Sequence, residues 1–205
     1  MGSVSGSPAF ETARPAAFLE EDEFIQCSEP AVRSLARQLR RSAVDDVTYA
    51  KAAFEWVRDQ VGHSWDVADP RVTLTAGEVL EHRVGLCYAK SHLLAALLRG
   101  EGIPTGLCYQ RLVDGARFVL HGLVAVHLRG DWHRQDARGN KEGVDAQFSL
   151  AAEKLAWPVD ESVGEIDYPQ LFASPVRSVV DALRAATDVL ALCDGGLPTG
   201  LDGPR

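Results

Sequence analysis

The sequence GLCYAKSHLLAALLRG, residues 85–100, is the most informative segment of this chain. Apolar and small side chains occupy most of its positions, which is the composition of a helix buried on all sides. Gly100 ends the segment, and Gly102 and Pro104 follow it; these are residue types that terminate helices. We therefore predict a buried helix that begins beside Cys87.

The position of Cys87 at the start of this predicted helix has a chemical consequence. The unpaired backbone amides and the positive dipole end of a helix stabilise a thiolate, and the thiolate is the nucleophilic form of cysteine. In the middle of a helix the same residue would only pack, since free cysteine is among the most buried residue types. Position alone leaves both interpretations open, a catalytic thiol and a packing residue.

The segments around this helix predict an α+β domain, because helices precede it and an antiparallel sheet follows it. Residues 118–128 are almost continuously apolar, which is typical of a central strand buried on both faces. Arg129-Gly130-Asp131 predicts a hairpin turn after that strand. Hydrophobic periodicity and breaker residues give the following set: helices over 30–39 and 46–61, strands over 105–113, 117–128 and 132–137, and a last helix over 176–192.

His121 and Asp136 are candidates for the other two groups that a cysteine nucleophile needs, a base and a residue that orients the base. His121 lies inside the most apolar predicted strand, an unusual place for a histidine without a partner. Asp136 lies near the end of the next predicted strand, and a hairpin near 129–130 lays the two strands side by side. A tight two-residue turn would leave the pair several residues apart, so we expect a wider loop or a bulge.

The remaining histidines and cysteines are weaker candidates. His127 shares a strand face with His121 but lies roughly 20 Å along the strand, so the two cannot share a metal ion. His127 and His133 could pair across the hairpin, but no cysteine or carboxylate stands at ligand spacing, and we predict no metal site. We expect structural or exposed positions, without a direct catalytic role, for His63, His82, His92, Cys27, Cys108 and Cys193, with Cys108 a buried strand residue.

The composition excludes several classes of protein. The chain has 205 residues, of which 46% are hydrophobic and 24% charged, so it is neither disordered nor of low complexity. Its formal net charge of -8 argues against a nucleic-acid partner, which would require clustered basic residues. No apolar run reaches the ~18 residues of a membrane span, so we expect no membrane association. The four dispersed cysteines and the absence of a visible signal peptide predict reduced thiols and a cytoplasmic protein.

One domain is expected at this length. We predict a flexible lead over residues 1–14, a single domain over 15–195, and a flexible tail over 196–205. Residues 157–175 contain three prolines and Gly164, which favour an extended crossing over a helix. The aromatic residues Trp157, Tyr168 and Phe172 would allow this crossing to cover the mouth of a cleft as a lid, although a plain surface crossing is the simpler interpretation.

Three ordered motifs in residues 46–140 resemble the core of the transglutaminase-like superfamily. The first joins the block at 85–89 to Leu97-Leu98-Arg99 and Gly102-Ile103-Pro104, and the others are the strand around His121 and the segment Trp132-x-x-x-Asp136. This resemblance implies a papain-like α+β core with N-terminal helices, in which a catalytic helix packs on an antiparallel sheet. It also implies a Cys-His-Asp triad at Cys87, His121 and Asp136, and no cofactor.

Two departures from the family limit what the resemblance implies about the substrate. An aromatic residue often follows the family's histidine, whereas this chain has Gly122 there. The animal cross-linking enzymes are also much larger, multidomain and calcium-dependent. Because the family includes amide-crosslinking transferases, peptidases, amidases and inactive members, the fold and the triad carry over better than the substrate does.

The reaction that we expect is cysteine-dependent acyl transfer on an amide or peptide-like substrate, through a thioester acyl-enzyme. Cys87 attacks the carbonyl, His121 takes the thiol proton and later protonates the leaving amine, and Asp136 orients the imidazole. The backbone N–H of Cys87 would bind the oxyanion together with a second donor. The indole of Trp65 is a candidate for that donor, although packing is the commoner role of a tryptophan.

The fate of the acyl group is left open by the sequence. Hydrolysis, as in an amidase or peptidase, is narrowly preferred because water needs no second binding site. The alternatives are transglutaminase-type amide formation with an amine acceptor, acyl transfer from a thioester carrier in a biosynthetic pathway, and a binding module that keeps the fold without turnover.

Overall fold

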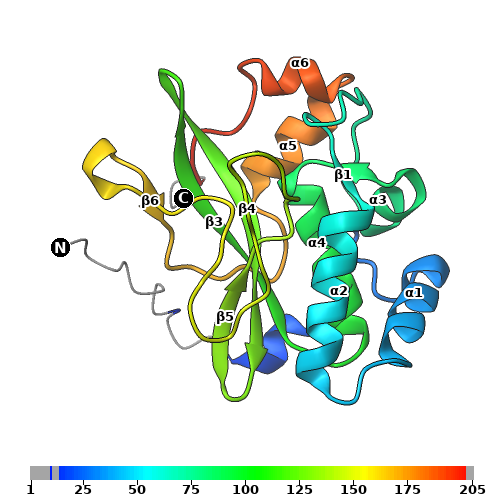
Figure 1. Cartoon of the computed structure of the whole chain (residues 1–205). Helices are drawn as coiled ribbons and strands as arrows, with labels where there is room; N and C mark the ends of the chain where they lie inside the picture. Colours follow the sequence, from blue (N-terminus) through cyan, green and yellow to red (C-terminus); the bar gives the residue numbers. More distant parts are fainter. Residues whose placement is uncertain (1–9, 11–13, 202–205) are drawn as a thin grey trace.

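The computed structural model of this chain describes Phe10 and residues 14–201. Helices form one layer and a curled antiparallel sheet forms the other (Figure 1). The elements in chain order are η1 (Pro15–Phe18), α1 (Pro30–Arg40), α2 (Asp46–Gln60), β1 (Gly62–His63), α3 (Ala76–His82), β2 (Val84–Gly85), α4 (Cys87–Gly100), β3 (Thr105–Asp114), β4 (Arg117–Leu128), β5 (Asp131–Gln135), η2 (Glu161–Val163), β6 (Ile166–Asp167), α5 (Arg177–Ala185) and α6 (Val189–Cys193).

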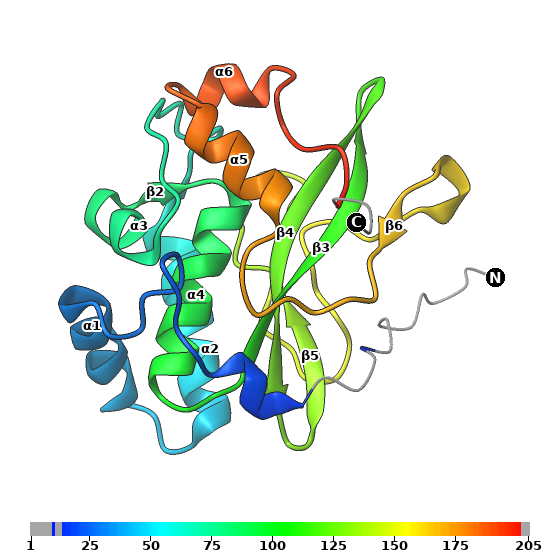
Figure 2. The same cartoon turned by 180° about the vertical axis from the view of Figure 1, so that it is seen from behind.

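The helix α4 is the centre of the molecule, as its sequence predicts. Every residue from Cys87 to Arg99 is buried. The helices α1–α3 lie on one side of α4 and the sheet lies on the other (Figures 1 and 2). The hydroxyl of Tyr49 on α2 donates to the carbonyl of Leu97 at 2.7 Å, which satisfies a polar group inside this apolar contact. The prediction of a buried helix packed on an antiparallel sheet is confirmed.

The main sheet has the strand order β5-β4-β3-β6, and all neighbouring strands are antiparallel. The predicted central strand is β4, which lies between β3 and β5. The register pairs Leu128 with Asp131, so only Arg129 and Gly130 form the turn. Both residues have positive φ, 55° and 91°, which is the mirror-image turn that matches the twist of a hairpin. The expectation of a wider loop or bulge is therefore wrong.

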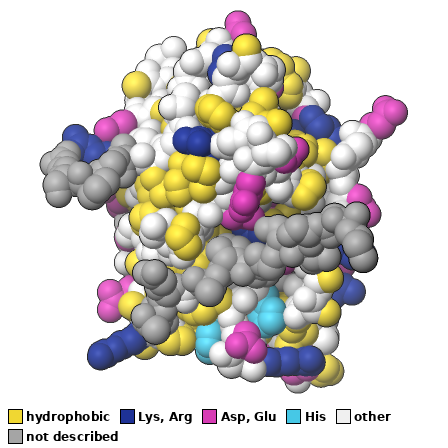
Figure 3. All heavy atoms as spheres, turned by 90° about the vertical axis from the view of Figure 1, so that its left-hand side faces the viewer, with side chains coloured by type: hydrophobic (Ala, Val, Ile, Leu, Met, Phe, Trp, Pro, Cys, Tyr) yellow, Lys and Arg dark blue, Asp and Glu magenta, His cyan; other side chains and the backbone are white. Residues whose placement is uncertain are grey.

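The outer face of the sheet is covered by the chain that follows β5. Leu155 and Leu171 pack on a small apolar cluster of β3 and β4 side chains, Cys108, Leu123 and Ala125. Within residues 157–175, which we expected to be extended, β6 pairs with β3. Lys and Arg side chains are dispersed among acidic ones over the face shown in Figure 3.

Two predictions about helices need correction. The segment 176–192 is not one helix but two, because Asp188 begins a new one: its carboxylate accepts from the amides of Leu190 and Ala191 at 2.8 and 3.2 Å. The helix α3 was not predicted. Its start is marked in the sequence by Thr75 and Glu78, which form a reciprocal capping box.

The packed domain extends beyond the predicted boundary at residue 195. The carbonyl of Pro198 accepts from the Leu120 amide of β4 at 2.6 Å, and Leu197 and Leu201 contact the core. Most of the predicted lead, 1–14, and the end of the predicted tail, 202–205, lie outside the described residues. In the described part of the chain, no helix is long and apolar enough to cross a membrane.

Candidate active site

Cys87 is the first residue of α4, and the residue is 8% exposed. The preceding residue, Leu86, occupies the N-cap position and makes no side-chain capping hydrogen bond, so no side chain competes for the first amides of the helix. The backbone N–H of Gly122 on β4 donates to Sγ of Cys87 at 3.5 Å. The sheet therefore directs one backbone donor towards this sulfur, which also lies at the positive dipole end of α4.

His121 and Asp136 are in direct contact. The Nε2–H of His121 donates to Oδ2 of Asp136 at 2.8 Å, and the Asp136 side chain is 1% exposed. The amides of Ala156 and Arg138 also donate to this carboxylate, at 3.0 and 3.1 Å. Burial would raise the pKa of Asp136, but the charge of His121 and these hydrogen bonds hold it below its usual range.

The register explains how a tight turn still allows this contact. Val124 pairs with Gln135, the last residue of β5, so Asp136 continues the ladder one step towards Leu123. His121 lies two residues further along β4, on the same face, and diagonal neighbours in an antiparallel pair are within reach of each other. The strand predicted over 132–137 ends at Gln135, which frees the backbone of Asp136 from the sheet.

The imidazole of His121 links the two other members of the predicted triad. Because Nε2 faces Asp136, Nδ1 is the nitrogen left for the thiol. Burial alone would lower the pKa of His121, but the Asp136 carboxylate and interactions with Cys87 raise it to about 10. The structure thus brings together all three residues predicted from the sequence, with the imidazole favoured in its charged form.

An aromatic cover lies over the histidine. The ring of Trp157 meets His121 edge-to-face, with centroids 5.1 Å apart, and the guanidinium of Arg138 lies 5.2 Å from the Trp157 ring centre. Trp157 belongs to the stretch 157–175, whose other aromatic residues, Tyr168 and Phe172, pack against the core instead. Only the start of that stretch and Glu165 border the site.

A pocket of about 410 Å³ opens onto Cys87 and His121. Trp65, the predicted second oxyanion donor, lines this pocket but is 52% exposed. His63, which we expected at a structural or exposed position, also lines it, and so does Cys193. Sequence reasoning missed His63 because it lies in a two-residue strand, too short to give a hydrophobic pattern.

The structure explains why glycine occupies position 122, where the family often has an aromatic residue. A Cβ at this position would lie 2.8 Å from Cδ1 of Tyr88, closer than real side-chain contacts. The hydroxyl of Tyr88 donates to the carbonyl of Leu120, which holds its ring against β4. Tyr88 thus occupies the space that a side chain after the histidine would need.

His92, Cys108 and His127 do not line this pocket. His92 is buried with Nδ1 2.7 Å from the carbonyl of Leu74, and Cys108 is a buried strand residue, as predicted. His127 packs on Trp132 with ring centroids 5.1 Å apart. Among the residues that the structure describes, no group of three His, Cys, Asp or Glu side chains could hold a metal ion.

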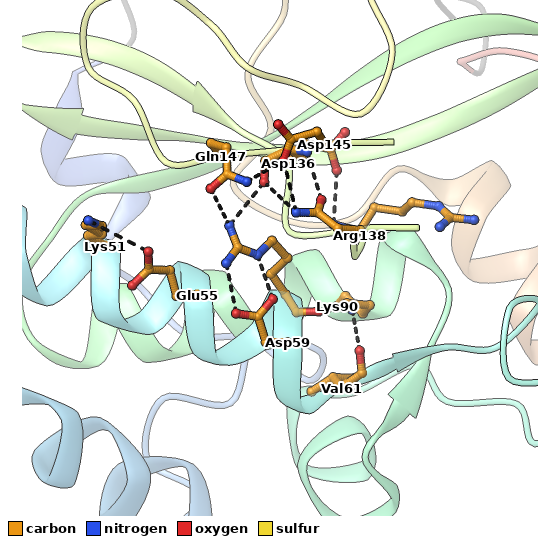
Figure 4. A network of polar contacts seen from close by, with 12 residues as sticks. Lys51, Glu55, Asp59, Val61, Lys90, Asp136, Arg138, Asp145 and Gln147 are labelled. Carbon is orange, nitrogen blue, oxygen red and sulfur yellow. Dashed lines mark hydrogen bonds and ion pairs between the residues drawn. The ribbon is translucent and has the colours of Figure 1, made fainter. Parts of the chain in front are cut away.

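A buried lysine lies beneath the triad. The Nζ of Lys90 on α4 donates to the carbonyls of Val61 and, at 3.4 Å, Arg58 at the end of α2 (Figure 4). Burial lowers the pKa of Lys90 to about 7. Arg58 in turn donates to the Gln147 side chain at 2.9 Å. This network ties α2, α4 and the chain after β5 together next to Asp136.

Comparison with known proteins agrees with this geometry. The transglutaminase-like superfamily matches residues 33–137, about half of the chain, and that range includes Cys87, His121 and Asp136. The chain belongs to the transglutaminase-like superfamily. No curated protein shows a significant sequence match to it.

Solved structures of two other proteins are similar to this chain. A protein from Cytophaga hutchinsonii, provisionally described as a cysteine protease, matches with a TM-score of 0.53 and 18% identity over 66% of this chain. The periplasmic domain of TgpA from Pseudomonas aeruginosa, bound to ethylmercury, matches with a TM-score of 0.46 and 19% identity over 62% of this chain. The matches cover 46% and 50% of those chains, so this chain corresponds to about half of each.

Proposed function

We propose that this protein is a cysteine-dependent acyl-transfer enzyme that acts on an amide or peptide-like substrate. The observation that carries the proposal is the buried pair of His121 and Asp136, joined at 2.8 Å, beside a cysteine at a helix start. Membership of the transglutaminase-like superfamily supports a cysteine-dependent catalytic domain. The pocket over Cys87 supports access by a small part of a larger substrate.

In the first half of the proposed reaction, His121 Nδ1 takes the thiol proton of Cys87, and the sulfur attacks the substrate carbonyl. A C–S bond forms while the carbonyl π electrons move onto oxygen. The tetrahedral intermediate then collapses: the C–N bond breaks, and His121 returns its proton to the leaving amine. Asp136 stabilises the imidazolium between these two transfers, a role supported by the raised pKa of His121.

In the second half of the reaction, the thioester passes its acyl group to an acceptor. We propose water, since hydrolysis needs no second binding site. His121 would take a proton from that water as its oxygen bonds to the carbonyl carbon; the C–S bond would then break, and the proton would return to the Cys87 sulfur. Transfer to an amine is the alternative, and acyl transfer from a thioester carrier is a third. The alternative outside enzymes is a catalytically silent binding module, and the assembled triad weighs against it.

Alkylation of the four cysteines tests the proposed nucleophile. Burial raises the pKa of Cys27 and of Cys193 to about 11, and it also raises that of Cys108. We therefore expect iodoacetamide to modify Cys87 selectively at pH 6–7, as read by mass spectrometry of the peptides. His121→Ala should abolish this selectivity. If Cys87 of the folded protein reacts no faster than Cys27, the catalytic proposal is wrong and the binding module is favoured.

The choice of acceptor has a separate test. With an activated acyl donor such as p-nitrophenyl acetate, we expect free acetate as the main product even when a primary amine is added at millimolar concentration. A predominance of the acetylated amine would replace hydrolysis by transglutaminase-type transfer.

A further inference from the structure

His63 is held next to the segment that leads into the catalytic helix. The strand β1 pairs in parallel with β2, and the register places His63 opposite Gly85, two residues before Cys87. Two backbone hydrogen bonds fix this pairing: Gly62 N–H to Arg83 O at 2.9 Å and Ser64 N–H to Gly85 O at 3.2 Å. The ring of His63 is therefore positioned by the backbone that also positions the start of α4.

One nitrogen of the His63 imidazole lacks, within the described part of the chain, the hydrogen bond that a structural histidine would make. Its Nδ1 is enclosed and has no hydrogen-bond partner among the described residues, although the ring lines the same pocket as Cys87 and His121. Buried polar groups in native proteins are nearly always paired, and an unpaired one next to a pocket needs an explanation. With Nδ1 enclosed, Nε2 is the nitrogen that a molecule in the pocket can meet.

The surroundings of His63 keep its ring neutral. Burial lowers the pKa of His63 to about 3, and the positive charges of Arg138, Lys90 and His121 act in the same direction against the opposing charge of Asp66. A neutral imidazole has one donor and one acceptor. His63 can therefore donate a hydrogen bond while His121 carries the positive charge, without repulsion between the two rings.

We propose that Nε2–H of His63 donates a hydrogen bond to the substrate carbonyl oxygen, as the second oxyanion donor beside the backbone N–H of Cys87. This inference rests on the proposed function. When the Cys87 sulfur bonds to the carbonyl carbon, the oxygen gains the π electron pair and the hydrogen bond from His63 strengthens. No proton leaves His63, and the bond weakens again when the carbonyl re-forms and the C–N bond breaks.

His63 suits this role better than Trp65 does. Both side chains line the pocket, but Trp65 is 52% exposed, so water competes for its indole N–H. Oxyanion donors contribute most where water is excluded, and His63 is the more enclosed of the two. A donor from β1 also faces the pocket from a different element than α4, which allows two donors to converge on one oxygen.

Two reactions of Cys87 separate this role from effects on the thiol itself. Acylation by p-nitrophenyl acetate passes through an oxyanion, whereas alkylation by iodoacetamide displaces iodide at a saturated carbon and develops none. We expect His63→Leu to slow acylation by about 100- to 1,000-fold. The same variant should alkylate Cys87 within about threefold of the wild-type rate. His63→Gln, which keeps an N–H donor, should recover part of the acylation rate, and Trp65→Phe should change it little.

The outcomes distinguish failure of this inference from failure of the proposed function. If wild-type Cys87 is neither acylated nor selectively alkylated, the proposed function is wrong and the donor role falls with it. If wild type is acylated and His63→Leu matches it, or if both reactions slow by the same factor, only the donor role is wrong. Thermal melting of each variant identifies misfolding, and if His63→Leu does not fold, a wild-type acylation rate for a folded His63→Phe would equally overturn the role.

Discussion

Arg134 and Arg138 are four residues apart, both are buried, and both bind carboxylates, but their surroundings differ. The guanidinium of Arg134 meets Glu153 and Asp167 on the outer face of the sheet, away from the pocket. That of Arg138 meets Asp66 and lines the pocket over Cys87. We call these groups the Arg134 cluster (Arg134, Glu153 and Asp167) and the Arg138 cluster (Arg138, Asp66 and Lys141). Only the Arg138 cluster borders the candidate active site.

The guanidinium of Arg134 is completely paired. Its Nε donates to Glu153 at 2.7 Å, one terminal nitrogen donates to Glu153 at 2.6 Å and to Asp167 at 3.2 Å, and the other contacts Asp167. Gln110 adds a bond to the same aspartate at 2.8 Å. These contacts attach β6 and the chain before η2 to the sheet, and that chain continues to the amide of Ala156, which holds Asp136.

The Arg138 cluster is incompletely paired. Its two terminal nitrogens contact Asp66, but its Nε has no partner among the described residues. Lys141 also contacts Asp66, at 2.9 Å. His63 beside it has an unpaired Nδ1 as well. The difference teaches that buried charge alone does not mark this active site. Unpaired polar atoms mark it only where they border the pocket, because Gln110 Oε1 and His92 Nε2 are unpaired away from it within the described residues.

Removing Arg134 should have the largest effect, and it should be on stability. Arg134→Met removes a cation that contacts both Glu153 and Asp167, which are 23% and 14% exposed. We expect the free energy of unfolding in urea to fall by about 3 kcal/mol. The control Arg177→Met breaks an exposed pair with Asp181 and should cost less than about 0.5 kcal/mol. Equal effects of the two substitutions would contradict the structural role of the Arg134 cluster.

Removing Arg138 should affect the site more than the fold. In Arg138→Met, Asp66 keeps Lys141, so we expect a loss of about 1 kcal/mol in unfolding free energy. Trp157, which packs on His121, loses its covering guanidinium. Acylation by p-nitrophenyl acetate should therefore slow by about tenfold in molecules that remain folded. Folded Arg134→Met should retain the wild-type rate; a reversed order of the two rates would break the comparison.

Acid should weaken the Arg138 cluster, with the smallest effect of the three. Burial would raise the pKa of Asp66, but hydrogen bonds from Arg138 and Lys141 lower it to about 2. A depressed pKa in the folded state means that the contribution is present above the unfolded value near 4 and is lost as the pH falls towards 2. The stability difference between wild type and Asp66→Asn, on the order of 1 kcal/mol at pH 7, should shrink over that range. A difference independent of pH would contradict the assignment.

Most of the fold could be predicted from local patterns. The apolar segment at 85–100, the strand around His121 and the caps and breakers near the element ends predict the helix and strands that the structure shows. The failures were also local: α3 is short, and Asp188 divides the last helix by capping a new one. Both features extend over only a few residues, which is too short for a hydrophobic period to reveal them.

The sequence by itself determined which residues form the candidate triad, because Cys87, His121 and Asp136 lie in ordered motifs with a chemical reason for each residue type. Only the tertiary structure decided how they meet. The step from Gln135 to Asp136 past the end of β5, the cover by Trp157 and the pairing of β1 with β2 are contacts between distant parts of the chain. The energies of these contacts depend on packing and strand register. The sequence around His63 and around Arg138 therefore gives no local indication that either residue lies at the site.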